Sequence, residues 1–561
     1  MAARGERRRD GGESAGSFAA LYTPKLISVW REGYGLSAFR GDAVAGLTVA
    51  IVALPLSMAL AIASGVTPDR GLYAAIVGGF LVSALGGSRF QIGGPAGAFI
   101  VLVAATVDRH GVDGLLLATF MSGVMLAAIG WLRLGGYIRL IPFPVTVGFT
   151  AGIAIIIFAS QLHDLFGLTL PGREPGPLLD KLFALGRAAG TVSVAATAVA
   201  AFTILVIIGV RRWRPSWPAM LIAVVAASLV TTALALDVET IGSRFGGIPS
   251  GLPMPALPAF SIAMMQAVLP DAIAFALLGS IESLLSAVVA DGMTGRRHRP
   301  NAELVAQGVA NMGTALFGGI CVTGTLARTA TNVRAGAHGP VAGMLHSVFL
   351  LAFMMLAAPL AAYVPLAALA GLLAVVAWTM FEKHEFAALL RSSWSDAAVL
   401  LVTFALVIFR DLLTGIVVGF IVAALLFIDR MSKSVSVGKG AGGDEPEAAY
   451  DPEMEQHPDL LVYRVDGALF FGAAANLGVA LDRVAGPHTT FVLDCTAAPF
   501  IDSSAAHVIA GAARKAKRAG VRFVVAGAST AARRMLMAHG VRPPLVRYKA
   551  SAGAARRAAA K

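Results

Sequence analysis

Long apolar stretches recur along the first 429 residues of the chain. A helix needs about 20 apolar residues to cross the hydrocarbon core of a bilayer, and twelve stretches approach that length. They are 43–63, 71–85, 115–132, 143–162, 191–210, 219–236, 272–290, 302–317, 341–362, 366–381, 395–409 and 412–428. The pattern predicts a polytopic α-helical membrane protein.

Two further apolar stretches are too broken to cross a membrane alone. Residues 89–107 are interrupted by Gly93, Gly94, Pro95 and Gly97, and residues 318–335 by Gly324, Arg328 and Asn332. Each follows a Gly-Gly pair and is the third element of its half of the chain. Such paired interruptions indicate the binding site of an inverted-repeat transporter. We therefore predict fourteen segments, as a cytoplasmic N-terminal segment (1–42) and two inverted repeats of seven (43–236 and 237–429).

Composition and charge agree with this interpretation. The 561 residues are 57% hydrophobic and 14% charged, whereas soluble domains carry about 25% charged residues. The net charge is +12. With the N-terminus inside, about 20 basic residues of the membrane part lie on the cytoplasmic side and about 7 outside, as the positive-inside rule expects. Nucleic acid is not needed to explain the charge, and we expect an inner-membrane protein with both termini cytoplasmic.

The composition changes after Arg430. Residues 430–458 are rich in Gly, Glu, Asp and Pro, which predicts a linker. Residues 459–561 alternate short strands and helices, which predicts a small cytoplasmic α/β domain with a basic tail. The expected strands are 460–465, 490–493 and 522–525, and the expected helices are 474–484, 504–519 and 530–539. Two cysteines provide neither a disulfide framework nor a zinc site, so no metal or cofactor is expected.

The first interrupted segment contains the features of a helix start. In Gly94-Pro95-Ala96-Gly97-Ala98, proline suits the first helical turn, and glycine allows a ligand to approach the backbone. A helix that begins near the membrane midplane directs its free N–H groups and positive end at a cavity, which makes an anion site. The alternative is a helix kink at a packing interface.

The second interrupted segment adds a cation. In Thr325-Leu326-Ala327-Arg328, the arginine follows the expected helix start by about one turn. A charged side chain inside a membrane is costly, so we expect it to face the protein interior or a wet cavity. Snorkelling to an interface or a structural pair with Glu282 are the alternatives. Residues 94–98 and 325–328 are the predicted substrate-binding residues.

Glu282 lies near mid-depth of its span, and Ser286 is one turn further on the same face. Desolvation favours the protonated form of a carboxylate, so Glu282 could load and release a proton. The oxygens of Glu282 and Ser286 could instead bind sodium. Gln307 and Asn311, four residues apart, are interpreted as hydrogen-bonding between spans.

The C-terminal domain contains Asp502-Ser503 where a strand gives way to a helix. Either residue suits the N-cap, and an exposed Ser503 would lie where a phosphate is accommodated. Capping alone is the favoured interpretation. The chain contains no P-loop, dinucleotide glycine pattern or Ser/His/Asp triad, so it is not expected to be an enzyme.

These residues together resemble the SulP sulfate permease family, which includes sulfate, bicarbonate and dicarboxylate carriers and prestin. The similar segments are Gly86-Gly-Ser-Arg-Phe-Gln-Ile-Gly-Gly-Pro-Ala-Gly-Ala-Phe99, Leu54-Pro55, Gly71-Leu-Tyr-Ala74, Glu282-Ser283 and Thr325-Leu-Ala-Arg328. Leu493-Asp494 and Ile501-Asp-Ser-Ser504 resemble the STAS domain of that family. The resemblance covers nearly the whole chain.

The resemblance implies a homodimer that works by an elevator movement. Each protomer would have a core domain (spans 1 to 4 and 8 to 11) and a gate domain (spans 5 to 7 and 12 to 14), with substrate between half-helices 3 and 10. Arg328 matches the substrate-site arginine of the family. Glu282 matches an acidic position associated with proton coupling, where sodium-linked bicarbonate members carry Asp. Ser503 matches a serine phosphorylated in soluble STAS proteins, although Ala505-Ala506 replaces their Gly-Leu.

The function expected from the sequence is proton-coupled symport of sulfate or a similar oxyanion or dicarboxylate. A sodium-dependent bicarbonate symporter is the alternative within transport. A signalling or scaffold protein, whose STAS domain recruits cytoplasmic partners, is the alternative of another class. A nucleobase carrier is also possible on fold alone, but Arg328 suits an anion better.

Overall fold

The computed structural model describes residues 21–138, 142–172, 175, 177–215, 217–433, 436–439, 460–470, 481 and 489–559. The chain divides into two compact units, Met1–Phe420 and Ile421–Lys561. In the described ranges, eight helices are long and apolar enough to cross a membrane. Two shorter apolar helices, Ala219–Ala233 and Trp394–Phe409, accompany them.

The first half of the helical unit contains the elements expected for spans 1 to 7. They are α2 (Lys25–Arg31), α3 (Leu36–Ala63), α4 (Pro68–Tyr73), a π-helical turn (Ala74–Gly78), α5 (Gly79–Leu85), β1 (Gly93–Gly94), a 3-10 turn (Gly97–Phe99), α6 (Ile100–Trp131), α7 (Gly135–Ile138), α8 (Phe143–Phe166), α9 (Leu178–Arg187), a 3-10 turn (Ala189–Thr191), α10 (Val194–Trp213) and α11 (Ala219–Ala233). Inside α6, Gly111 has φ +68° and ψ −172°, a conformation that glycine adopts readily. This break separates the third expected span from the fourth.

The second half repeats this order. Its elements are α12 (Ile241–Phe245), α13 (Ile262–Thr294), α14 (Pro300–Leu316), β2 (Thr323–Gly324), α15 (Leu326–Arg334), α16 (Val341–Ala361), α17 (Leu366–Met380), α18 (Lys383–Ser392), α19 (Trp394–Phe409) and α20 (Leu412–Lys433). The short helices α9, α12 and α18 were not expected. Their sequences are too polar or too short to resemble spans.

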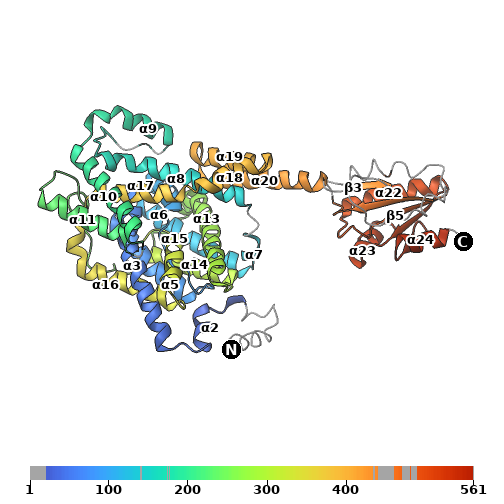
Figure 1. The fold of residues 1–561 in the computed structure, drawn as a ribbon, viewed down its shortest axis with the longest axis horizontal. Helices are drawn as coiled ribbons and strands as arrows, with labels where there is room; N and C mark the ends of the chain where they lie inside the picture. The colour runs from blue at the N-terminus through green and yellow to red at the C-terminus, as the bar shows by residue number, and fades with distance from the viewer. Residues whose placement is uncertain are drawn as a thin grey trace. The chain divides into compact units, whose positions relative to one another are not determined.

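The packing of the two halves follows the inverted repeat. Helix α3 packs on α16, and its counterpart α13 packs on α6 (Figure 1). The first span of each half therefore lies against the fourth span of the other. Helices α6 and α14 touch backbone to backbone, since a Cβ on Gly123 would lie 2.6 Å from the Gly308 carbonyl oxygen. Small residues allow this close approach between membrane helices, and the expected 7+7 architecture is confirmed.

The second unit contains a five-stranded sheet with the order β3-β4-β5-β6-β7. Its strands are β3 (Ser436–Lys439), β4 (Leu460–Asp466), β5 (Thr490–Asp494), β6 (Arg522–Ala526) and β7 (Arg547–Lys549). Strands β4 to β7 are parallel, and β3 is antiparallel to β4. The three expected strands, and two of the expected helices as α22 (Ser503–Arg518) and α23 (Thr530–Ala538), are present. A further helix, α24 (Ala552–Ala559), packs on β4 to β7.

The region expected to be a linker is partly structured. Helix α20 continues past Arg430 to Lys433, and Ser436–Lys439 form β3. The sequence Ser434-Val435-Ser436-Val437 alternates polar and β-branched residues, a short strand pattern that the linker prediction did not use. In the structure β3 pairs with β4. Of the helix expected at 474–484 the structure describes Leu481 alone, so this helix stays a prediction.

Candidate anion-binding site

A two-residue ladder joins the two interrupted segments. Gly93 pairs with Gly324 and Gly94 with Thr323, antiparallel. The chain then enters the 3-10 turn at Gly97 on one side and α15 on the other. Because the strands are antiparallel, these helices leave the ladder in opposite directions with their N-terminal ends close to it. The first helix thus starts at Gly97, two residues after the proline at which we expected it.

Neither helix start is capped by a side chain. The N-cap residues are Ala96 and Thr325, and neither makes a side-chain capping bond. The first amides of a helix have no intrahelical acceptor, so these N–H groups are available to a ligand. The structure thus brings the two predicted helix starts to one ladder, and a positive helix end favours a nearby anion; that an anion binds here stays a prediction.

Arg328 reaches across the ladder from the second half to the first. Its side chain is 2% exposed, and Nη2 donates to Ser57 Oγ of α3 at 3.1 Å. Nε and Nη1 have no hydrogen-bond partner among the described residues. A Cβ on Gly94 would lie 1.8 Å from Nη1, so the guanidinium rests against the first segment. Its burial disfavours snorkelling and leaves donors free for an anion.

Glu282 lies near this cation without a direct pair. The carboxylate is partly buried, and its Oε2 atom is buried with no hydrogen-bond partner. Among the described residues no ion pair within 4.0 Å joins Glu282 to Arg328. Ser286 instead donates to Thr329 Oγ1 at 3.2 Å, and Thr329 also accepts from Ile92 N at 3.1 Å. The expected Glu282 and Ser286 face is present, but Ser286 is bonded to α15.

Sequence reasoning missed Gln91, which mirrors Arg328. Its Nε2 donates to Ser283 O and Ser283 Oγ, both at 3.1 Å. A Cβ on Gly324 would lie 1.4 Å from Nε2, so Gln91 covers Gly324 as Arg328 covers Gly94. The sequence does show Gln91 as a polar residue within a largely apolar segment. It gives no indication that Gln91 bonds to Ser283 of α13.

The first half-helix start also touches the helices of the expected gate domain. A Cβ on Gly97 would lie 3.2 Å from Met380 Sδ of α17 and 3.3 Å from Ile157 Cδ1 of α8. A cavity of about 1210 Å³ begins one turn further, where Ile100 and Ile156 line it. The predicted site therefore lies beside helices α8 and α17, which the resemblance assigns to the gate domain.

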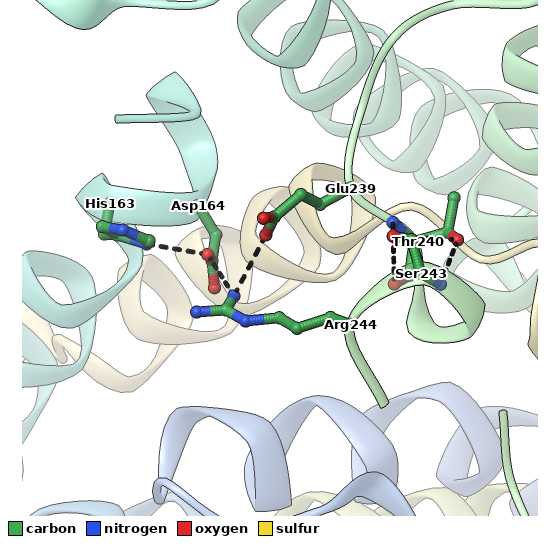
Figure 2. A network of polar contacts seen from close by, with 6 residues as sticks. All are labelled: His163, Asp164, Glu239, Thr240, Ser243 and Arg244. Carbon is green, nitrogen blue, oxygen red and sulfur yellow. Dashed lines mark hydrogen bonds and ion pairs between the residues drawn. The ribbon is translucent and has the colours of Figure 1, made fainter. Parts of the chain in front are cut away.

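A polar network that includes His163, Asp164 and Arg244 lines this cavity. Figure 2 shows Arg244 of α12 reaching Asp164 of α8, with Nη1 at 2.9 Å from Oδ1. His163 Nδ1 lies 2.8 Å from the same oxygen, and Glu239 Oε2 lies 3.6 Å from Arg244 Nη1. Thr240 caps α12 through Ser243 in a capping box. These contacts fix α12 against α8 at the cavity wall.

In the C-terminal domain Asp502, and not Ser503, is the helix cap. Asp502 Oδ1 accepts from Ala505 N at 2.8 Å, and Ser503 is exposed at the first helical position. Separately, the described residues contain no cluster of three His, Cys, Asp or Glu side chains able to hold a metal ion.

Gly94→Ala is expected to weaken anion binding. The new methyl group would overlap the Arg328 guanidinium, so the cation must move away from the helix starts. With sulfate as the probe anion in proteoliposome uptake, we expect KM to rise at least about ten-fold, which corresponds to about 1.4 kcal/mol. Gly209→Ala on α10 is the control, because nothing lies within 4 Å of its Cβ. An unchanged KM in Gly94→Ala would show that Gly94 is not part of the anion site.

Two interrupted helices that meet at one ladder, in an inverted repeat of apolar helices, define a membrane transport protein. Residues 39–403 match the sulfate permease family and residues 451–550 match the STAS domain. The chain belongs to the sulfate permease family.

Named relatives and solved structures are similar to the chain over most of its length. The chain is 38% identical to the putative sulfate transporter YvdB of Bacillus subtilis (90% of this chain, 94% of that protein). It is 30% identical to the bicarbonate transporter BicA of Synechocystis (89% and 90%). The structure of murine Slc26a9, an anion transporter in the inward-facing state, matches with a TM-score of 0.85 at 18% identity (99% and 97%). The transmembrane domain of a cyanobacterial BicA matches with a TM-score of 0.60 at 31% identity (70% and 98%).

Proposed function

We propose that the protein is a secondary active transporter of sulfate or a similar small oxyanion or dicarboxylate. The observation that carries the proposal is the buried guanidinium of Arg328, which keeps free donors beside two uncapped helix starts. A buried cation without a counter-ion is costly, and a bound anion would offset that cost. The name of the 38% identical relative, a putative sulfate transporter, supports sulfate.

The proposed coupling ion is a proton carried by Glu282. The buried Oε2 atom has no hydrogen-bond partner in the described structure, and protonation would give this carboxyl group a donor. Sodium-dependent bicarbonate symport is the second candidate. It is supported by the hydroxyl oxygens of Ser286 and Thr329 on the adjacent helix face and by the 30% identity to a bicarbonate transporter.

Replacing sodium by choline separates the two candidates. Purified protein in proteoliposomes should take up radiolabelled sulfate at an unchanged rate in choline, because the proposed coupling ion is the proton. An inward proton gradient should raise the initial rate. Bicarbonate and dicarboxylates, added as competitors at two pH values, would rank the anions. Uptake that disappears in choline and is inhibited more strongly by bicarbonate than by sulfate would favour the second candidate.

For the transport movement we propose an elevator mechanism in a homodimer of the inner membrane. The half-helix starts belong to the core helices, whereas Ile157 and Met380 belong to the gate helices that touch Gly97. Sliding of the core past these apolar side chains would carry the site from one side of the membrane to the other.

For the STAS domain we propose docking of a cytoplasmic partner, with the exposed Ser503 as its phosphorylation site. Because β3 belongs to its sheet, removal of the domain has to begin at residue 434. Loss of partner binding with uptake intact would support a regulatory role. Loss of both would mean that the domain is part of the transporter itself.

A further inference from the structure

Three buried polar residues follow one face of α14. Glu303, Gln307 and Asn311 are spaced four apart, so their side chains lie one above another along the helix. Each is at most 1% exposed. Buried polar groups are costly unless they are hydrogen-bonded. The partners of these three residues therefore indicate what the face does. We call them the α14 polar row.

The members of the row are bonded to one another. Gln307 Nε2 donates to Glu303 Oε1 at 3.1 Å, and Asn311 Nδ2 donates to the Gln307 carbonyl oxygen at 2.9 Å. The row is thus continuous from the first turn of α14 to its last turns.

Glu303, at the N-terminal end of the row, binds the turn that precedes β1. Ser88 N donates to Glu303 Oε2 at 2.9 Å, and Ser88 lies in the turn that leads to the first interrupted segment. At the same turn Arg299 N donates to the Gly87 carbonyl oxygen at 2.9 Å. A Cβ on Gly87 would lie 2.1 Å from the Arg299 carbonyl oxygen, so glycine is required for this approach.

Asn311, at the other end of the row, binds the residue that precedes β2. Asn311 Nδ2 donates to the Val322 carbonyl oxygen at 2.8 Å, and Val322 N donates to Asn311 Oδ1 at 2.9 Å. The side-chain amide thus pairs with the backbone as a neighbouring strand would. Val322 directly precedes β2, so the amide extends the support of the ladder by one residue.

Helix α14 consequently connects the residues that precede β1 with the residue that precedes β2. The eight helical steps from Glu303 to Asn311 rise about 12 Å. The ladder between β1 and β2 has two residues per strand, too few to be stable without further packing. The residues that hold it therefore determine where the two helix starts lie.

We propose that the α14 polar row is a positioning element that fixes the two half-helix starts relative to each other and thereby sets anion affinity without touching the anion. The inference rests on the anion site proposed above. It assigns a shared role to Gln307 and Asn311, which the sequence indicated only as hydrogen-bonding residues between spans, and to Glu303, which the sequence did not single out.

Asn311→Leu tests the proposal, because leucine has a similar size and removes both bonds to Val322. We expect the KM for sulfate uptake in proteoliposomes to rise at least ten-fold while the maximal rate per folded protein changes less than two-fold. Thr314→Val is the matched control. Thr314 is buried on the same helix, and its Oγ1 has no partner among the described residues, so its KM should stay within two-fold of wild type.

Hydrogen exchange read by mass spectrometry provides a measurement that does not depend on transport. In Asn311→Leu we expect faster exchange in residues 320–326 and, across the ladder, in residues 88–94, with Thr314→Val unchanged. Gln307→Leu breaks the row but keeps both end contacts, and it replaces Asn311→Leu if that variant does not fold. For Gln307→Leu we expect a two- to five-fold rise in KM.

The outcomes separate the two levels of inference. Faster exchange confined to α14, or an unchanged KM with exchange altered in both segments, would overturn the positioning role. If wild-type protein takes up no sulfate while exchange rises in both segments of the variant, the proposed substrate fails and the structural role of the row stands.

Discussion

Arg328→Ala is expected to abolish sulfate uptake. Hydrogen bonds to charged groups contribute about 1.5–3 kcal/mol each, so losing two donors raises Kd by about 100-fold or more. The substrate-free protein should not lose stability, because the guanidinium is buried with one hydrogen bond, to Ser57, and no ion pair among the described residues. A buried charge without a counter-ion is costly, so removing it offsets the loss of the bond to Ser57. Uptake in proteoliposomes and thermal unfolding with and without sulfate measure both effects.

Two variants control this result. Arg334→Ala changes an exposed arginine in the last turn of the same helix, α15, and should transport like wild type. Arg328→Lys keeps the charge but loses the planar fork of donors, so we expect partial uptake with a higher KM. Sulfate-dependent stabilisation that survives in Arg328→Ala would show that the anion binds elsewhere.

Glu282→Gln is expected to remove the dependence of uptake on a proton gradient. Glutamine resembles the protonated carboxyl group but cannot release a proton, so the variant should still bind sulfate. In wild type, uptake should rise as external pH falls from about 8 to about 6 against a constant internal pH. The variant should show a flat profile and equilibrate sulfate without accumulating it. Initial rates at several external pH values measure this difference.

Ser286→Ala is the matched control for the coupling ion. It removes the hydroxyl group that bonds to Thr329 and leaves the carboxyl group of Glu282 in place. If the proton is the coupling ion, Ser286→Ala keeps a pH-dependent rate. Accumulation driven by a proton gradient in Glu282→Gln would contradict the assignment, and a sodium requirement lost in Ser286→Ala would favour sodium.

The helical segments and the chemistry of the site could be predicted because they are local properties of the chain. The length of apolar stretches sets which helices can span a membrane, and Gly93, Gly94 and Gly324 mark where two of them are broken. Arg328 and Glu282 were found as charges within apolar sequence. The short helices α9, α12 and α18 were missed because their sequences are too polar or too short to resemble spans, and β3 was missed within the expected linker, where it pairs with β4.

What the sequence determined by itself is the class of protein, the two interrupted segments and the two intramembrane charges. Only the tertiary structure decided that Arg328 rests on Gly94, that Gln91 covers Gly324 and bonds to Ser283, and that Ser286 bonds to Thr329. The same holds for the bond between Asn311 and Val322. Except for the last, these pairs are separated by 43 to more than 230 residues. Packing of elements within the second repeat, for Ser286 and Thr329, and between the two repeats, for the other distant pairs, brings their atoms together, and no local pattern specifies it.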